Sequence, residues 1–312
     1  MNDTLTLVLG LVAAAAGGEL FVRGSVGIAS WLRVPPGIIG LTVAAFATSS
    51  PELAVSISAA RQGDAAIALG NALGSNVVNI GLILGVALLI APLKVPDGTA
   101  RRDYPLAILA PIMTLVLALD GVLSRLDGAI LLGLFAVWLG TSLRAAYVQR
   151  RDATAEVLGE RDHGRAIAEA GGGLVLLLIA GNWIVTGSVG LASQWGLDPF
   201  VVGATLVAAG TSMPELATVV VAGLRGHDEV GLGTILGSNL FNGLLIVGLS
   251  IVLVPAAVVP AEIAGSTIFG ALLIAMIWPG RSGVLLRRRG MLLVALYVAY
   301  LAAVIQFGPA TG

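Results

Sequence analysis

The chain has 312 residues, of which 57% are hydrophobic and 11% are charged, and its formal net charge is −1. A soluble globular domain has about 25% charged residues, so this composition excludes one and predicts an integral membrane protein in a lipid bilayer. The nearly balanced charge gives no reason to expect a nucleic-acid partner. The chain has no cysteine and only two histidines. We therefore expect no disulfide, no zinc–thiolate site, no thiol catalysis and no resident cofactor.

Ten apolar runs predict ten membrane-spanning helices. The runs cover residues 5–32, 37–60, 67–91, 104–119, 128–147, 171–195, 199–223, 230–254, 261–279 and 291–307. The first run follows Asp3 rather than a basic segment, and it is longer than the apolar region of a secretory signal peptide. We interpret it as a retained helix.

The least apolar stretch, 149–169, predicts a connecting loop between five helices in residues 1–148 and five in residues 170–312. Of the 17 Lys and Arg residues, 14 fall in the loops that follow odd-numbered spans, and two fall in the others. This asymmetry predicts that the odd-to-even loops, including 149–169, are cytoplasmic. From that orientation we predict a multi-pass protein of the cell membrane with both termini outside the cytoplasm.

An internal repeat appears when the chain is aligned with itself at an offset of 163. Residues 40–79 and 203–242 align without a gap and share 18 identities in 40 positions, including TS-PELA and LGSN. Because Thr, Ser, Pro, Glu and Asn match together, similar apolar composition alone does not explain the identities. The sequence predicts a duplication, with repeated cores at about 37–91 and 199–254.

Each half has an odd number of predicted helices, so the second half enters the membrane from the opposite side. Two inverted five-helix repeats related by an axis in the membrane plane are typical of secondary transporters. The fold class we predict is therefore an all-α integral membrane protein of about ten helices in two inverted repeats. Such an axis predicts that Glu52 and Glu215 meet near the midplane.

The motif Thr48-Ser49-Ser50-Pro51-Glu52 lies in the middle of the second predicted span. Pro51 lacks an N–H and clashes with the preceding turn, so we expect a break that frees carbonyls around 45–48. Freed carbonyls in a bilayer need a partner such as water or a cation, and an acid at this depth is functional by default. The second half repeats the arrangement with Ala208, Thr211, Ser212, Pro214 and Glu215.

These groups are all hard oxygen donors, which suit Na⁺ and Ca²⁺ rather than soft metals. The motifs GSNVVN and GSNLFN add Ser75, Asn79, Ser238 and Asn242. Their oxygens complete a cation shell in one interpretation and make hydrogen bonds between helices in the other. We interpret Asn76 and Asn239 as packing residues. Glu19 and Arg23, four residues apart, predict a structural ion pair, and Asn182 and Thr186 stand at the matching positions of the second half.

At these residues the chain resembles the calcium/cation antiporter superfamily, and most closely its prokaryotic sodium/calcium exchanger branch. The paired stretches GLTVAAFATSSPELAVS with LGNALGSNVVNI and GATLVAAGTSMPELATV with LGTILGSNLFNG carry the resemblance. It implies a core of predicted helices 2, 3, 7 and 8, across which helices 1 and 6 slide to alternate access. Ca²⁺ and Na⁺ would be the transported ions, and no obligatory protein partner is evident.

The resemblance also implies roles for individual residues. Glu52 and Glu215 would bind Ca²⁺ with the carbonyls of Thr48 and Thr211, and Asn79 and Asn242 would lie at the centre. Flanking Na⁺ sites would use Ser49, Ser212, Ser75, Ser238 and the carbonyls of Ala45 and Ala208. Some relatives have Asp where this chain has Asn242, so this site has two carboxylates, not three, and the ion stoichiometry stays open.

The leading hypothesis from the sequence is an antiporter that exchanges Ca²⁺ for Na⁺ through a site at the bilayer midplane. A proton-driven Ca²⁺ antiporter is the alternative, because the same carboxylates accept protons. The inverted repeat argues against a channel. Glu with Ser or Thr alone is poor evidence for an intramembrane enzyme.

Overall fold

A computed structural model describes residues 3–61, 65–95, 99–152, 163–194, 212–280 and 282–307. The chain divides into two units. The first unit consists of Met1–Thr48 and Trp138–Gly237, and the second of Ser49–Val137 and Ser238–Gly312. Each unit therefore combines segments from both halves of the sequence.

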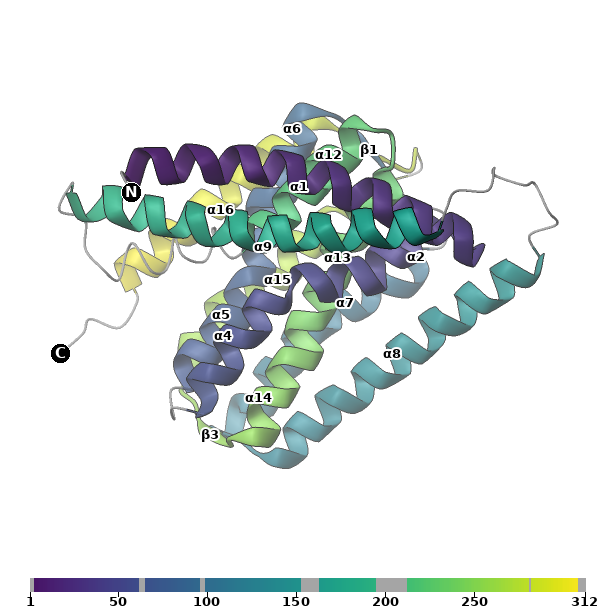
Figure 1. Cartoon of the computed structure of the whole chain (residues 1–312). Coiled ribbons are helices and arrows are strands. Elements are labelled where there is room, and N and C mark those ends of the chain that lie inside the picture. Colours follow the sequence, from purple (N-terminus) through teal and green to yellow (C-terminus); the bar gives the residue numbers. More distant parts are fainter. Residues whose placement is uncertain are drawn as a thin grey trace. The chain divides into compact units, whose positions relative to one another are not determined.

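Two long helices, α1 (Asp3–Leu32) and α9 (His163–Gln194), lie side by side and antiparallel in the first unit (Figure 1). Glycines allow their backbones to approach closely, as is common between helices in lipid. A Cβ added at Gly24 would lie 2.7 Å from the carbonyl oxygen of Ala166, and one added at Gly187 would lie 2.7 Å from that of Asp3. Gly24 and Gly187 are equivalent under the offset of 163, and so are the residues they face, so the contact is reciprocal.

The second predicted span begins in the first unit. It consists of α2 (Pro36–Ile39), the π-helix η1 (Gly40–Ala44) and α3 (Ala45–Thr48). It packs against α13 (Asp228–Leu240) through small residues, since a Cβ at Gly40 would meet the Val230 carbonyl at 2.6 Å. Helix α12 (Met213–Leu224) packs against α1, α3 and α9.

The second unit contains the remaining helices. From the first half of the chain these are α4 (Ser50–Arg61), α5 (Ala65–Val77), the π-helix η2 (Val78–Leu84), α6 (Gly85–Ile90), α7 (Thr99–Leu117), the 3₁₀ helix η3 (Ala118–Asp120) and the start of α8 (Arg125–Asp152). From the second half they are the π-helix η5 (Phe241–Ile246), α14 (Val247–Leu253), α15 (Pro260–Met276) and α16 (Arg287–Phe307). Helix α15 packs against α5 and α7, and α16 packs against α6 and η2.

Two short antiparallel strand pairs join the two halves of the sequence within the second unit. Strand β1 (Leu93–Lys94) pairs with β4 (Val284–Leu285), and β2 (Val122–Leu123) pairs with β3 (Ala256–Ala257). After β2, helix α8 begins at a capping box, in which the Asp127 carboxylate accepts from the Ser124 backbone N–H at 2.7 Å and the Asp127 N–H donates to the Ser124 hydroxyl. Strands thus link loops that lie far apart in the sequence.

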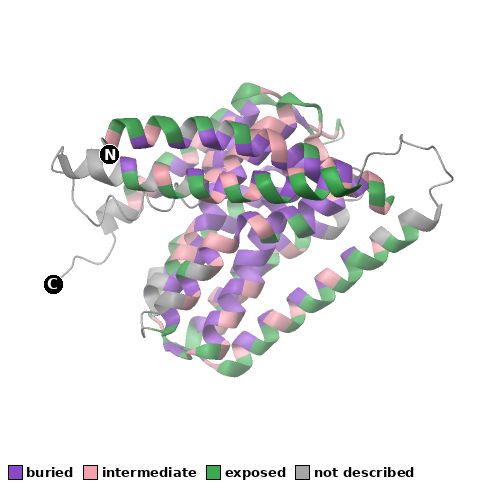
Figure 2. Ribbon diagram, viewed as in Figure 1, coloured by how far each residue is buried: buried purple, intermediate pink, exposed green. Residues whose placement is uncertain are grey.

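Large apolar side chains on several outer helices are exposed, including Val12 of α1, Val137 of α8 and Val298 of α16 (Figure 2). Apolar surface of this extent suits contact with lipid. Among the described residues, six helices are long and apolar enough to cross a membrane, and the pair of helical segments interrupted at Ser49 would make a seventh. The shorter apolar helices are Met213–Leu224 and Ile263–Met276. The number ten stays a prediction, and residues 199–211 of the seventh predicted span lie outside the described residues.

The bounds predicted for the connecting loop, 149–169, are wrong at both ends. Helix α8 continues to Asp152 and α9 already begins at His163. Polar residues are compatible with a helix that extends beyond the apolar layer, and Arg165 and Glu169 form an i,i+4 ion pair of 2.8 Å on its surface. The polar residues therefore mark where the apolar part of α8 and α9 ends, not where each helix itself ends.

The close approach of α1 and α9 predicts that Gly24→Ala destabilises the protein. The new Cβ would lie 2.6 Å from the Ala170 Cα, so the backbones must separate, at a cost of about 1–3 kcal/mol. The free energy of unfolding in detergent measures this loss. Gly171→Ala is the matched control, because a Cβ at Gly171 of α9 meets nothing within 4 Å. Equal stability of the two variants would contradict the packing described.

Candidate ion-binding site

The two predicted carboxylates occupy the same local structure in their respective units. Glu52 lies in the first turn of α4 and Glu215 in the first turn of α12, and each residue is 1% exposed. The second residue of each helix is a proline, Pro51 and Pro214. The carbonyls of Ser49 and Ser212 accept from the backbone N–H of the residue after each glutamate, at 3.0 and 3.1 Å. A helix N-terminus favours a negative charge, so each carboxylate is placed where its ionised form is stabilised.

The break expected before Glu52 is present at Ser49, between α3 and α4. Thr48 is fully buried, and its hydroxyl donates only a long hydrogen bond of 3.4 Å to the Ala45 carbonyl. In the first unit, α3 packs against α12, the helix that carries Glu215. The segment with Ala45 and Thr48 therefore lies beside a helix of the other sequence repeat. Thr211 and Ala208 lie outside the described residues.

Asn76 and Asn239 form reciprocal hydrogen bonds in the second unit. The Asn76 amide donates to the Asn239 backbone carbonyl at 3.2 Å, and the Asn239 amide donates to the Asn76 carbonyl at 3.3 Å. The Asn79 amide donates to the Asn239 side-chain oxygen at 3.2 Å. The partners in the reciprocal pair are 163 residues apart, which is the repeat offset. These residues join α5 to the last turn of α13, which belongs to the same unit, a specific pairing that the sequence analysis did not identify.

Several buried oxygens of the second unit have no hydrogen-bond partner among the described residues. Those in the repeated GSN motifs are Ser75 Oγ, Asn76 Oδ1, Asn79 Oδ1 and Asn242 Oδ1, and Tyr104 and Ser250 each add a hydroxyl oxygen elsewhere in the unit. Ser75, Asn79, Ser238 and Asn242 are each at most 1% exposed. Leaving a buried polar atom without a partner costs about 1–3 kcal/mol. These oxygens therefore suit a ligand that is coordinated by several neutral oxygen atoms at once. A hard cation has that property.

Packing within the second unit brings together the helical segments that carry these groups. Helix α4, which carries Glu52, packs against α5, which carries Ser75, and both pack against η5, which carries Asn242. Among the described residues, no three His, Cys, Asp or Glu side chains lie close enough together to hold a metal ion. A cation bound in this unit would thus meet the Glu52 carboxylate and mainly neutral oxygens.

The sequence analysis missed Asn71, which contacts the helical turn that carries Glu52. Its amide donates both to the Glu52 backbone carbonyl, at 3.0 Å, and to the Ser56 hydroxyl, at 2.9 Å. The Ser56 hydroxyl donates in turn to the Ala68 carbonyl at 3.1 Å. Asn71 therefore fixes the turn of α4 that carries the glutamate. The sequence signal for Asn71 was an asparagine within an apolar run. The second repeat has Thr234 at the equivalent position, and the Thr234 hydroxyl donates to a carbonyl of its own helix.

The π-helices were also missed. Asn79 and Asn242 are each the second residue of one, in η2 and η5, and η1 precedes the break at Ser49. π-Helical turns occur frequently at functional sites. Each widens the helix just where the candidate oxygens lie. Apolar periodicity has no feature that distinguishes a π-turn from an α-turn, so the sequence predicted continuous α-helices here.

Comparison with known proteins relates both halves of the chain to one family. The family described as sodium/calcium exchanger protein matches residues 3–144 and 167–306. Inner membrane protein YrbG of Escherichia coli is 34% identical over 252 residues, which cover 78% of this chain and 78% of the relative. Sodium/calcium exchanger MaX1 of Methanosarcina acetivorans is 31% identical over 287 residues, covering 78% and 81%. The solved structure of the sodium/calcium exchanger from Methanococcus jannaschii has a TM-score of 0.81 at 29% identity, covering 96% and 97%.

The asparagine cluster predicts an energetic coupling between Asn79 and Asn239, whose side chains bond directly. In a double-mutant cycle of Asn79→Ala and Asn239→Ala, we expect a coupling of about 0.6–1.7 kcal/mol in the free energy of unfolding in detergent. The control cycle combines Asn79→Ala with Asn71→Ala, because the bonds of Asn71 run to Glu52 and Ser56. Couplings of the same size in both cycles would show that the bond has no specific effect.

Proposed function

This chain belongs to the sodium/calcium exchanger protein family, and from that premise we propose that it is a secondary antiporter that exchanges Ca²⁺ for Na⁺ by alternating access. The family is one of transporters rather than enzymes, and this chain is a largely helical membrane protein. What carries the proposal is the pair Glu52 and Glu215, each 1% exposed at a helix start. An acid buried at such a place in a membrane protein needs a counter-charge.

In the proposed site, Glu52 and Glu215 bind Ca²⁺ together with the carbonyls of Thr48 and Thr211. Asn79 and Asn242 lie at its centre. The flanking Na⁺ ligands are Ser49, Ser212, Ser75, Ser238 and the carbonyls of Ala45 and Ala208. Ca²⁺ takes 6–8 oxygens, more than either motif offers alone, so the proposal requires both repeats. The unpartnered oxygens of Ser75, Asn79 and Asn242 support it.

The proposed architecture is ten helices in two inverted repeats, with both termini outside the cytoplasm. An in-plane two-fold axis makes equivalent residues meet in self-complementary pairs. The reciprocal bonds of Asn76 and Asn239 have this form. The matching contacts of Gly24 and Gly187 have it as well. These pairs support the axis at two separate places in the chain.

Charge balance explains why exchange would be coupled. Two carboxylates are neutralised by one Ca²⁺, two Na⁺ or two protons, and an unneutralised pair of buried charges resists enclosure in protein. The occupied site can therefore be closed and carried, while the empty site stays open to one side. The same arithmetic keeps a proton-driven antiporter as the second candidate, because two protons neutralise the site equally well.

Vesicles that contain the purified protein distinguish the two candidates. We expect an outward or inward Na⁺ gradient to drive Ca²⁺ movement in the opposite direction, and an imposed pH gradient without Na⁺ to drive little. Protein-free vesicles under the same gradients are the control. Ca²⁺ movement driven by the pH gradient but not by Na⁺ would contradict Na⁺ coupling and establish the second candidate.

Removing either buried charge should abolish exchange without unfolding the protein. For Glu52→Gln and Glu215→Gln we expect near-complete loss of Ca²⁺ exchange, because the remaining carboxylate does not balance a divalent ion. Asp120→Asn is the matched control, since Asp120 is exposed and accepts only a local hydrogen bond from Val122 at 3.1 Å. Gel filtration checks folding. Normal exchange by either Gln variant would refute the site assignment.

A further inference from the structure

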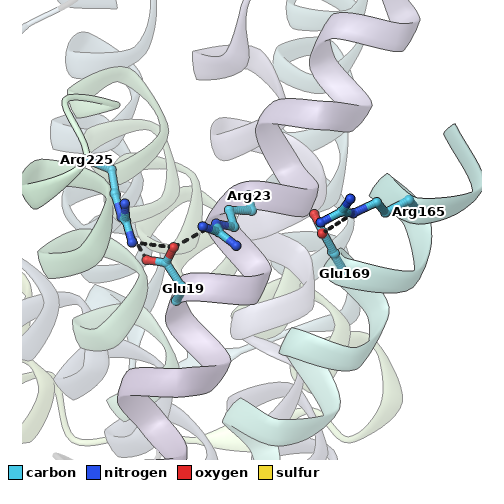
Figure 3. A network of polar contacts seen from close by, with 5 residues as sticks. All are labelled: Glu19, Arg23, Arg165, Glu169 and Arg225. Carbon is cyan, nitrogen blue, oxygen red and sulfur yellow. Dashed lines mark hydrogen bonds and ion pairs between the residues drawn. The ribbon is translucent and has the colours of Figure 1, made fainter. Parts of the chain in front are cut away.

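An ion pair outside the candidate site joins α1 to α12 in the first unit (Figure 3). The expected pair of Glu19 and Arg23 is confirmed, with Arg23 Nε 2.8 Å from Glu19 Oε1. Arg225, at the C-terminal end of α12, also binds this carboxylate. Its Nε donates to Glu19 Oε2 at 2.9 Å and its Nη2 donates to Glu19 Oε1 at 2.6 Å. The bond between Glu19 and Arg225 is thus bidentate and connects two helices, whereas Arg23 lies on the same helix as Glu19.

The helices that this pair connects are already in close contact. A Cβ added at Gly18, next to Glu19, would lie 3.1 Å from the carbonyl oxygen of Ala217 in α12. The planar fork of an arginine matches a carboxylate only in a narrow range of positions. Movement of α1 along α12 by even one helical turn would therefore break both hydrogen bonds. The pair forms in one relative position of the two helices and stabilises that position.

The second repeat has no equivalent of this pair. At the offset of 163, Asn182 takes the place of Glu19, and Gln62 takes the place of Arg225. Asn182, on α9, accepts from the Thr186 hydroxyl at 3.3 Å, and Gln62 lies outside the described residues. Residues 170–194 contain no Asp or Glu. The other repeat therefore has neutral residues at both matching positions, so this ion pair has no counterpart at these two positions.

In a transporter of inverted repeats, the two access states arise when the repeats exchange their conformations. The contact that α1 makes with α12 in one state is then made, in the other state, by α9 with the helix of the first repeat that is equivalent to α12. We propose that Glu19 and Arg225 form a one-sided latch, which stabilises the access state with α1 and α12 in the contact described here over its counterpart. This inference rests on the proposed alternating access and adds an energetic difference between its two states.

The size of the effect follows from the exposure of the two groups. The Glu19 side chain is 26% exposed and the Arg225 side chain 53% exposed, so water screens the attraction. Pairs of this kind shift an equilibrium by about two- to fivefold. Because the apparent affinity for an ion scales with the fraction of protein that is open to it, loss of the latch changes the Michaelis constants for Ca²⁺ on the two membrane faces in opposite directions.

The test measures Na⁺-driven Ca²⁺ transport in right-side-out and inverted vesicles and compares the ratio of the two Michaelis constants. For Glu19→Gln, Arg225→Gln and the double variant, we expect the ratio to change about two- to fivefold in one direction, with the double variant no different from either single one. Arg23→Gln is the matched control, because it removes a positive charge that pairs with the same carboxylate but breaks no bond between the two helices. It should leave the ratio near that of the unmodified chain.

A charge exchange, Glu19→Arg with Arg225→Glu, should restore the ratio. An unchanged ratio in both single Gln variants would overturn the latch, and so would an equal change in Arg23→Gln. A rise of both constants together indicates general damage and also counts against it. The proposed function fails separately, when the unmodified chain shows no Na⁺-driven Ca²⁺ movement. If that chain couples Ca²⁺ to protons instead, the same ratio is measured under a pH gradient and decides the latch by the same outcomes.

Discussion

Burial of a carboxylate in an apolar helix is the constraint on which the other features depend. A charged side chain at the centre of a bilayer costs about 2.5–3.5 kcal/mol or more unless it is paired or solvated. Glu52 and Glu215 are almost fully buried, each in the first turn of a helix and directly after a proline. The chain stabilises them locally through the helix N-terminus, and a bound cation would complete the neutralisation. A helix break at Ser49 and the π-helices at Asn79 and Asn242 accompany the candidate oxygens.

A second requirement is that the surrounding frame be firm. Asn71 fixes the backbone at Glu52, and the reciprocal bonds of Asn76 and Asn239 join α5 to the last turn of α13. Glycines let α1 and α9 approach until their backbones touch. The Arg225 and Glu19 pair then adds a contact of a different kind, partly exposed and easily broken. Firm packing around the oxygens and a weak ion pair between α1 and α12 together suit a transporter that moves as rigid parts.

Apolar runs were sufficient to place the described helices, because length and hydropathy in lipid leave few alternatives. The Glu19–Arg23 pair was predictable from a spacing of four residues, whereas Arg225 lies 206 residues from its partner. The repeat offset identified Asn76 and Asn239 as equivalent, but not that they bond each other, since that depends on where the axis passes. The π-helices have no sequence signal. The ends of α8 and α9 were misplaced because polarity follows the apolar layer and not the helix.

The central claim is that Ca²⁺ and Na⁺ use one site, built on the carboxylates of Glu52 and Glu215. Equilibrium binding of Ca²⁺ to the purified protein, measured in detergent at increasing Na⁺ concentrations, tests this claim most directly. The account predicts one Ca²⁺ per chain, with an apparent affinity that falls steadily as Na⁺ rises while the number of sites stays constant. A Ca²⁺ affinity that does not change with Na⁺ would show that the two ions bind independently, and would contradict the account.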